Sequence, residues 1–238
     1  MRKVSLINAF CCLVVALAIT PALAQGTKQK GAVPKPADQA PAVAVTPSAA
    51  DTSGDSKISV EGFRSAKFGT TEADVRSAIG KDFGLKPEAI KTQDNPAELT
   101  HSLLVTVPDL LPNGGGAEVS YVFGYKSKSL IQVGAAWSKA TDSAMTPERL
   151  FSNANILRAH FLGEGFKPET VAVNTPVNGG LLMFRGSDAK DHTVMLLLQG
   201  TFETKDNNQR ALTPTGLLLF YIADAKSPDV FKLPPGQF

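Results

Sequence analysis

The chain has 238 residues, with 24 Lys and Arg against 22 Asp and Glu, and its only two cysteines are Cys11 and Cys12. The charges are nearly balanced and interspersed, so the sequence lacks the basic stripe typical of proteins that bind nucleic acid or anionic membranes, and we expect no nucleic-acid partner. Both cysteines lie in the N-terminal apolar run, which leaves the rest of the chain without disulfides, thiol nucleophiles or thiolate metal ligands.

Residues 1–24 match the three parts of a secretory signal peptide. Arg2 and Lys3 precede an apolar run at residues 9–19, and residues 21–24 (PALA) end in the small side chains that a signal peptidase reads. At ~1.5 Å per helical residue the run reaches about 17 Å, too short to cross a hydrocarbon core of ~30 Å. We therefore expect cleavage after Ala24, a periplasmic or secreted protein, and no transmembrane span in the mature chain.

Residues 25–57 are predicted to be a disordered linker. The segment is rich in Pro and Ala, with Pro34, Pro36, Pro41 and Pro47 interrupting any helix. It contains no large apolar side chain beyond a few valines, so it cannot offset the entropy lost on ordering. The folded part is expected to begin near Ile58.

A seven-residue motif occurs twice, as GLKPEAI at residues 84–90 and GFKPETV at residues 165–171. Each copy follows a predicted helix. Thr71 and Asp74 can form a capping box at the start of the first helix, and Thr146 with Pro147 can begin the second. The apolar stripes are Val75, Ile79 and Phe83 in the first helix and Leu150, Ala154, Leu157 and Phe161 in the second, with stops near Gly84 and Gly163.

Strand-like runs follow each copy of the motif. In the first half they cover about residues 99–107, 117–125 and 130–137, and in the second half about 180–185, 193–200 and 215–223. The pattern predicts an α+β fold of two tandem helix-plus-three-strand units, residues 58–140 and 141–230, followed by a tail at 231–238. We expect an antiparallel sheet with both helices packed on one face.

No local motif predicts a metal, a cofactor or a catalytic group. Residues 51–63 resemble a calcium-binding loop, but Ser56 replaces the glycine of the turn and Gly62 replaces the bidentate glutamate. His101, His160 and His192 lack the spacing of a zinc site and are interpreted as structural. No serine lies in a G-x-S-x-G motif. We expect no cofactor and no enzymatic activity.

Three side chains are candidates for an interaction surface. Arg64 could contact an anionic ligand, although its neighbours Phe63 and Phe68 are expected to enter the core while the charge stays in water. Tyr125 and Trp137 lie at the ends of adjacent predicted strands. They could anchor a contact, or they could simply close the core.

Residues 67–75 (KFGTTEADV), continuing to Ile79 and Gly80, resemble the helix start of small outer-membrane assembly lipoproteins of the small-protein-A type. The layout is also similar to that of the β-lactamase inhibitor protein, a tandem of related helix-plus-sheet units. The resemblance implies a binding module of the cell envelope and supplies no functional residue. The chain departs from the lipoproteins because Cys11 and Cys12 lie inside the apolar run, which is a poor site for lipid attachment.

Three functions remain open from the sequence. The first is a non-enzymatic exported binding or adaptor protein whose sheet contacts another protein or an envelope component. The second is a secreted enzyme inhibitor of similar build. The third is a hydrolase whose site is assembled from distant residues, which a deep pocket with converging carboxylates or histidines would favour.

Overall fold

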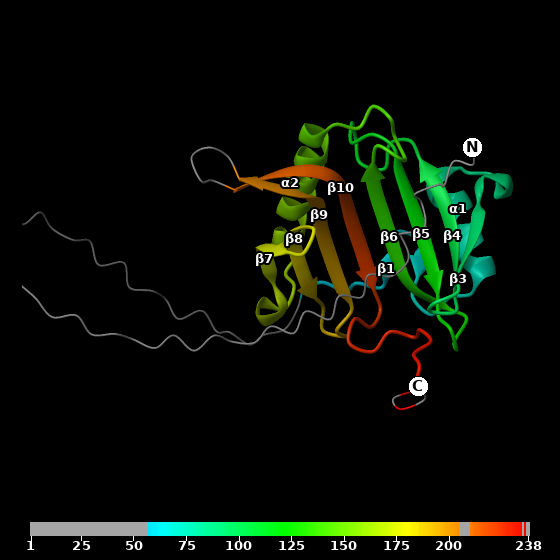
Figure 1. The fold of residues 1–238 in the computed structure, drawn as a ribbon. Helices are drawn as coiled ribbons and strands as arrows, with labels where there is room; N and C mark the ends of the chain where they lie inside the picture. The colour runs from blue at the N-terminus through cyan, green and yellow to red at the C-terminus, as the bar shows by residue number, and fades with distance from the viewer. Residues whose placement is uncertain (1–56, 205–209, 235, 237–238) are drawn as a thin grey trace, which may run out of the picture. The chain divides into compact units, whose positions relative to one another are not determined.

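The described residues form an α+β fold around one eight-stranded antiparallel sheet (Figure 1). The computed structural model describes residues 57–204, 210–234 and 236. The expected signal peptide (1–24), almost all of the expected linker (25–57) and residues 51–56 of the calcium-loop-like segment lie outside these residues. Within the sheet the strand order is β3-β4-β5-β6-β10-β9-β8-β7, so the chain forms two four-stranded meanders that meet at β6 and β10.

Each half contributes four strands to the sheet. The first half supplies β3 (Lys91–Asn95), β4 (Thr100–Val107), β5 (Ala117–Phe123) and β6 (Leu130–Ser138). The second half supplies β7 (Ala172–Val177), β8 (Gly180–Ser187), β9 (Thr193–Thr204) and β10 (Arg210–Ile222). The expectation of three strands per half is therefore wrong, because the polar edge strands β3 and β7 were not anticipated. Pairing of β10 with β6, from Gly216↔Ser138 to Ile222↔Gln132, makes the sheet continuous.

Helix α1 (Glu72–Phe83) begins with the predicted capping box, in which Thr71 Oγ1 accepts from Asp74 N and the Asp74 carboxylate accepts from Thr71 N. It ends at Gly84, whose φ of 64° is left-handed, as a C-terminal glycine allows. Helix α2 (Pro147–Gly163) begins with Thr146 Oγ1 accepting from Arg149 N at 3.2 Å.

The end of α2 differs from the expected stop at Gly163. Gly163 is the last helical residue, and the left-handed glycine is Gly165, with a φ of 80°. Gly165 is the counterpart of Gly84 in the repeated motif, and the Lys-Pro-Glu that each motif contains leads into a 3-10 turn, η2 (Pro87–Ala89) or η3 (Pro168–Thr170). The repeated motif therefore has the same local structure in both halves.

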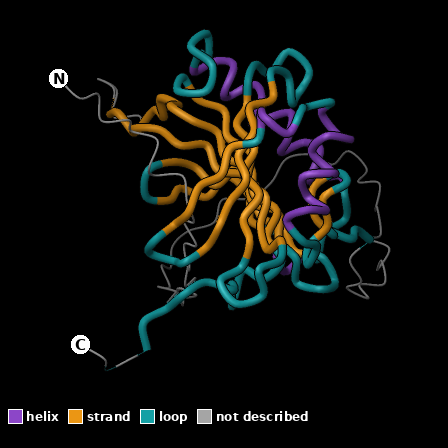
Figure 2. Tube along the Cα trace, turned by 90° about the vertical axis from the view of Figure 1, so that its right-hand side faces the viewer, coloured by secondary structure: helices purple, strands orange, loops and turns teal. Residues whose placement is uncertain are grey.

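Both helices lie on the same side of the sheet, as predicted (Figure 2). Their apolar stripes pack with the inward-facing side chains of the strands into one core, of which Val75, Ile79, Trp137, Leu150 and Leu196 are at most 2 % exposed. None of the described helices is long and apolar enough to cross a membrane.

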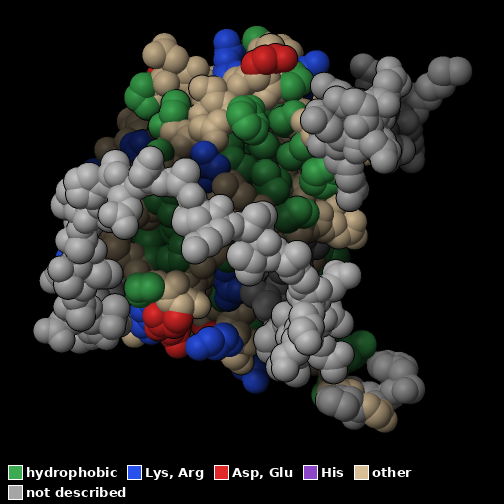
Figure 3. Space-filling model, turned by 90° about the vertical axis from the view of Figure 1, so that its left-hand side faces the viewer, with side chains coloured by type: hydrophobic (Ala, Val, Ile, Leu, Met, Phe, Trp, Pro, Cys, Tyr) green, Lys and Arg blue, Asp and Glu red, His purple; other side chains and the backbone are tan. Residues whose placement is uncertain are grey.

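The other face of the sheet carries a second, smaller apolar cluster. Along β10, Leu218, Phe220 and Ile222 alternate with core residues and so point away from the helices. They group with Ala136 and Leu197, and all of these side chains are at most 8 % exposed. We call this surface the helix-free face. Figure 3 looks at the β7 edge of the sheet, beside this face, and shows hydrophobic side chains near the middle, with Asp and Glu side chains toward the top and bottom.

A short hairpin precedes α1 and is positioned against the helix side of the sheet. It consists of β1 (Gly62–Phe63) and β2 (Ala66–Lys67), joined by Arg64 and Ser65. Phe63 and the following Phe68 pack against the core, as predicted. The Ser65 N–H donates to the Asp82 carboxylate of α1 at 2.9 Å, which fixes the turn of the hairpin beside the end of the helix.

Candidate functional site

Two of the three predicted interaction residues, Arg64 and Trp137, line the same cleft on the helix side of the sheet. The cleft has a volume of about 380 Å³. Its floor comes from the central strands β6 and β10, and its walls come from α2, the β1–β2 hairpin and the loop after β4. The lining residues are Phe63, Arg64, Leu110, Leu111, Trp137, Ile156, Leu157, His160, Phe161, Leu219 and Tyr221. We call this site the seam cleft, because its floor is the seam between the two halves.

The floor of the seam cleft is tightly packed. Trp137 is 1 % exposed and Leu219 is 3 % exposed. On β10, Tyr221 lies with its ring 5.3 Å from that of Phe63 and 6.4 Å from that of Phe161. Aromatic pairs at such distances stabilise each other beyond the area that they bury. The cleft is therefore a pre-formed hollow with aromatic and aliphatic walls.

Trp137 places an unpaired donor in this apolar setting. Its indole Nε1 is buried, and no acceptor for it is present among the described residues. A buried N–H without an acceptor costs about 1–3 kcal/mol, and such groups in folded proteins call for an explanation.

Arg64 is the strongest charge on the cleft wall. Its guanidinium carbon lies 5.7 Å from the ring centre of Phe63 and 4.8 Å from that of Phe83. Nη1 donates to the carbonyl oxygen of Asp82 at 3.4 Å. Among the described residues no carboxylate forms an ion pair with Arg64, and its positive charge lies next to apolar walls.

The phenol of Tyr221 reflects the low polarity of the floor. Burial raises the pKa of Tyr221 to about 12, with the charge of Glu164 acting in the same direction and that of Arg64 opposing both. Burial likewise raises the pKa of the Tyr121 phenol, again against the effect of Arg64. Arg64 therefore lies close enough to both tyrosines to act on them electrostatically.

Tyr125, the third predicted interaction residue, does not belong to the seam cleft. It follows β5, where its ring lies 5.5 Å from that of Phe231 and 5.4 Å from the ammonium of Lys128. Its N–H donates to the carbonyl of Asp229 at 2.8 Å. These contacts attach the C-terminal segment to the sheet.

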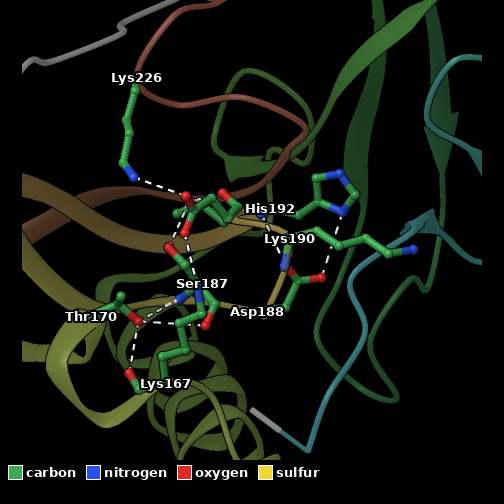
Figure 4. Close-up of polar contacts among 9 residues, drawn as sticks. Lys167, Thr170, Ser187, Asp188, Lys190, His192 and Lys226 are labelled. Atoms are coloured by element: carbon green, nitrogen blue, oxygen red, sulfur yellow. Dashed lines mark hydrogen bonds and ion pairs between the residues drawn. The ribbon is translucent and has the colours of Figure 1, made fainter. Parts of the chain in front are cut away.

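The most connected polar cluster is the turn between β8 and β9, and its contacts are those of a structural anchor (Figure 4). The Asp188 side chain is 1 % exposed. Its Oδ2 accepts from Val60 N at 2.8 Å, and its Oδ1 accepts from the N–H groups of Lys190 and His192 at 2.8 and 2.9 Å. One carboxylate therefore closes the turn and ties it to the segment before β1.

Asp191, in the same turn, holds two lysines. Its oxygens lie 3.0 Å from the ammonium of Lys167 and 2.9 Å from that of Lys226. Hydrogen bonds from Lys226 and Lys167, together with their charges, lower the pKa of Asp191 to about 2. The turn thereby links the motif at residues 165–171 to the segment after β10.

The histidines lie apart from one another. His101 contacts Asp94 at 2.6 Å, and His160 contacts Glu164 at 3.4 Å. His192 Nδ1 lies 2.6 Å from the carbonyl oxygen of Val60, which can only accept, so Nδ1 carries the proton. Across residues 57–204, 210–234 and 236, no group of three or more His, Cys, Asp or Glu side chains could hold a metal ion.

The residues that close the cleft from α2 and from the loop after β4 were not among the predicted site residues. Ile156 and His160 flank the predicted stripe of α2, so a helical projection of the sequence places them at its border. Leu110 and Leu111 lie in a segment without periodicity, and nothing local marks them. No protein-family model, curated protein or solved structure matches the chain, so the resemblance to envelope modules stays a prediction.

Proposed function

We propose that this chain is a non-enzymatic exported binding protein that takes a small, mainly apolar molecule into the seam cleft. The observation that carries the proposal is the cleft itself, about 380 Å³ in volume, with the buried indole of Trp137 in its floor. Small-molecule sites commonly measure ~300–1,000 Å³ and combine apolar walls with a few placed polar groups. The seam cleft fits the lower end of that range.

The lining favours binding over chemistry. Among the described residues that line the cleft, only Arg64 and His160 carry or can gain charge near neutral pH, and none is a carboxylate, serine or cysteine. The lining holds one side chain that could act as a general base, His160, but no serine, cysteine or carboxylate beside it to act as a nucleophile. A molecule in this cleft would meet walls and donors, which suits a carrier or sensor of an envelope component.

The single tryptophan makes the proposal directly testable. Trp137 is the only Trp in the chain, and its emission is quenched by a bromine atom that reaches van der Waals contact. We expect saturable quenching when the chain from Gln25 onward is titrated with 8-bromooctan-1-ol. Because Trp137 is 1 % exposed, a probe can reach it only by entering the cleft.

Helix α2 offers a matched pair of variants for this titration. Ile156 lines the cleft and Phe151 does not, although the two are 50 % and 49 % exposed on the same helix. Ile156→Glu should weaken the binding of the probe about tenfold, equivalent to ~1.4 kcal/mol, whereas Phe151→Glu should leave it unchanged. Absence of saturable quenching in the unmodified chain, or equal effects of both variants, would refute the proposal.

A second candidate function, contact with a protein partner, is favoured by the apolar cluster of the helix-free face. Leu218, Phe220 and Ile222 face the side of the sheet on which no described helix lies. These side chains are at most 8 % exposed, so a partner would contact the partly buried edge of the cluster, at Val177, Met195 and Ala225. Affinity capture from the cell envelope tests this function, because one stoichiometric protein should be recovered by the unmodified chain and lost with Met195→Glu, which changes the edge of the cluster.

A further inference from the structure

The hairpin turn places Arg64 in a backbone conformation that arginine disfavours. Its φ of 52° lies in the left-handed region, where Gly, Asn and Asp are the usual residues. An Arg at such a φ is disfavoured because its Cβ crowds the following carbonyl oxygen. The turn alone therefore does not explain an arginine here, and its side chain becomes the feature to account for.

The surroundings of Arg64 orient its guanidinium and leave its charge free. The rings of Phe63 and Phe83 hold it by cation–π contact, at 5.7 and 4.8 Å. The carboxylate of Asp82, at the end of α1, is engaged by the N–H of Ser65 at 2.9 Å. At the other side of the cleft, Glu164 lies 3.4 Å from His160 Nδ1. Neither carboxylate forms an ion pair with Arg64.

The seam cleft presents one charged donor to whatever occupies it. Arg64 offers guanidinium N–H groups at the wall, and the buried indole of Trp137 forms part of the floor. In the described part of the chain, no carboxylate lines the cleft to receive a cation. This charge pattern complements an anion and disfavours an ammonium group, since a charge that leaves water needs a partner of opposite sign.

We propose that the ligand of the seam cleft is an apolar carboxylic acid bound as its anion. Its carboxylate pairs with Arg64, and its hydrocarbon body lies against Trp137, Leu219 and Tyr221. Arg is suited to this task because its planar fork binds a carboxylate through two parallel N–H bonds. The inference rests on the proposed function and adds the charge and class of the ligand to it.

Two brominated probes of equal chain length separate the inference from the proposed function. Quenching of Trp137 emission is measured with 8-bromooctanoate and with 8-bromooctan-1-ol at pH 7.5. The acid should bind at least about tenfold more tightly than the alcohol, the ratio expected for one charge-assisted contact in a partly dry site. 8-Bromooctylamine should bind more weakly than either.

Arg64→Asn is the decisive variant, because Asn tolerates the left-handed φ and the turn should keep its fold. In this variant the acid should bind no more tightly than the alcohol. The matched control is Arg158→Gln on α2, because Arg158 bonds to Asn174 outside the cleft and its replacement should preserve the preference for the acid. An unchanged thermal midpoint confirms that the variants fold.

The outcomes distinguish the two proposals. If acid and alcohol bind equally well, or if the acid keeps its advantage in Arg64→Asn, the cleft binds apolar molecules but the assigned ligand class is wrong. Tighter binding of the amine also overturns the inference. If none of the three probes quenches Trp137 saturably, the proposed function fails and the inference fails with it.

Discussion

Replacement of Asp188 by alanine should be among the most destabilising polar changes in this chain. Its carboxylate accepts three backbone N–H groups, those of Val60, Lys190 and His192, at 2.8 to 2.9 Å. Asp188→Ala removes all three acceptors at once. The bond to Val60 N is buried, whereas the other two are partly buried, so the three donors do not lose equally.

The expected loss can be worked out donor by donor. A buried N–H without an acceptor costs about 2 kcal/mol, and each partly buried N–H that can turn to water costs about 0.5 kcal/mol. The total is about 3 kcal/mol. For a domain of this size that corresponds to a fall in the unfolding midpoint of about 6–12 °C.

Urea unfolding followed by circular dichroism measures this loss, with an unchanged slope as the sign that the same structure unfolds. Asp229→Ala is the matched control, because its carboxylate also accepts backbone N–H groups, those of Lys126 and Ser127 at 3.0 and 2.8 Å, but in an exposed turn. We expect it to lose about 1 kcal/mol or less. If the two variants lose the same amount, burial does not set the strength of these contacts and the reasoning is wrong.

Three further outcomes are expected. Phe184→Ala removes a core ring that is 0 % exposed and should destabilise the chain by about 3–5 kcal/mol in the same urea assay. The carboxyl of Asp191 should titrate near pH 2 by NMR, and Lys226→Gln should raise this pKa. The stability that this carboxylate contributes is fully present above the pKa it has in the unfolded chain, and it is lost as the pH falls toward 2. The pKa of Tyr221 is raised to about 12, so the contribution of its phenol to the free energy of unfolding is complete below pH 10 and declines as the pH rises toward 12. Tyr221→Phe should therefore make the free energy of unfolding less dependent on pH between about 10 and 12.

The helices could be predicted from the sequence because their signals are local. Thr71 and Asp74 form the capping box that their spacing predicts, and Thr146 caps α2 next to Pro147. Such contacts join residues within one turn, so they need no knowledge of the rest of the fold. The stop of α2 was misplaced because Gly163 and Gly165 are both plausible, and local sequence alone does not choose between them.

The edge strands were missed for the opposite reason. β3 reads KTQDN, with no buried side chain, and β7 contains Pro176. Polar residues and proline protect an exposed sheet edge from pairing with other chains, and they also remove the apolar alternation that marks a strand. What makes a good edge strand therefore makes a poor sequence signal.

The seam cleft was predicted only as separate residues. Arg64 and Trp137 were candidates for different reasons, one for its charge and one for its aromatic ring. Their proximity depends on the pairing of β6 with β10 and on the docking of the β1–β2 hairpin, both of which are long-range. Tyr125, singled out by the same aromatic argument, lies at Phe231 instead. Residue type indicated which side chains are unusual, and topology decided which of them meet.

The cleft follows from the number of strands that the two described helices have to cover. Eight strands at ~4.8 Å spacing make a sheet about 34 Å wide, whereas two helices of ~10–12 Å diameter cover about 20–24 Å of it. Helix α2 packs against β10, β9 and β8, so the width that the helices leave uncovered lies beside α2, toward β6. The β1–β2 hairpin fills part of that gap and brings Arg64 to its edge, and the remainder is the seam cleft. In the described part of the chain no further helix completes the core at this point, which leaves a space of the width that a small apolar ligand needs.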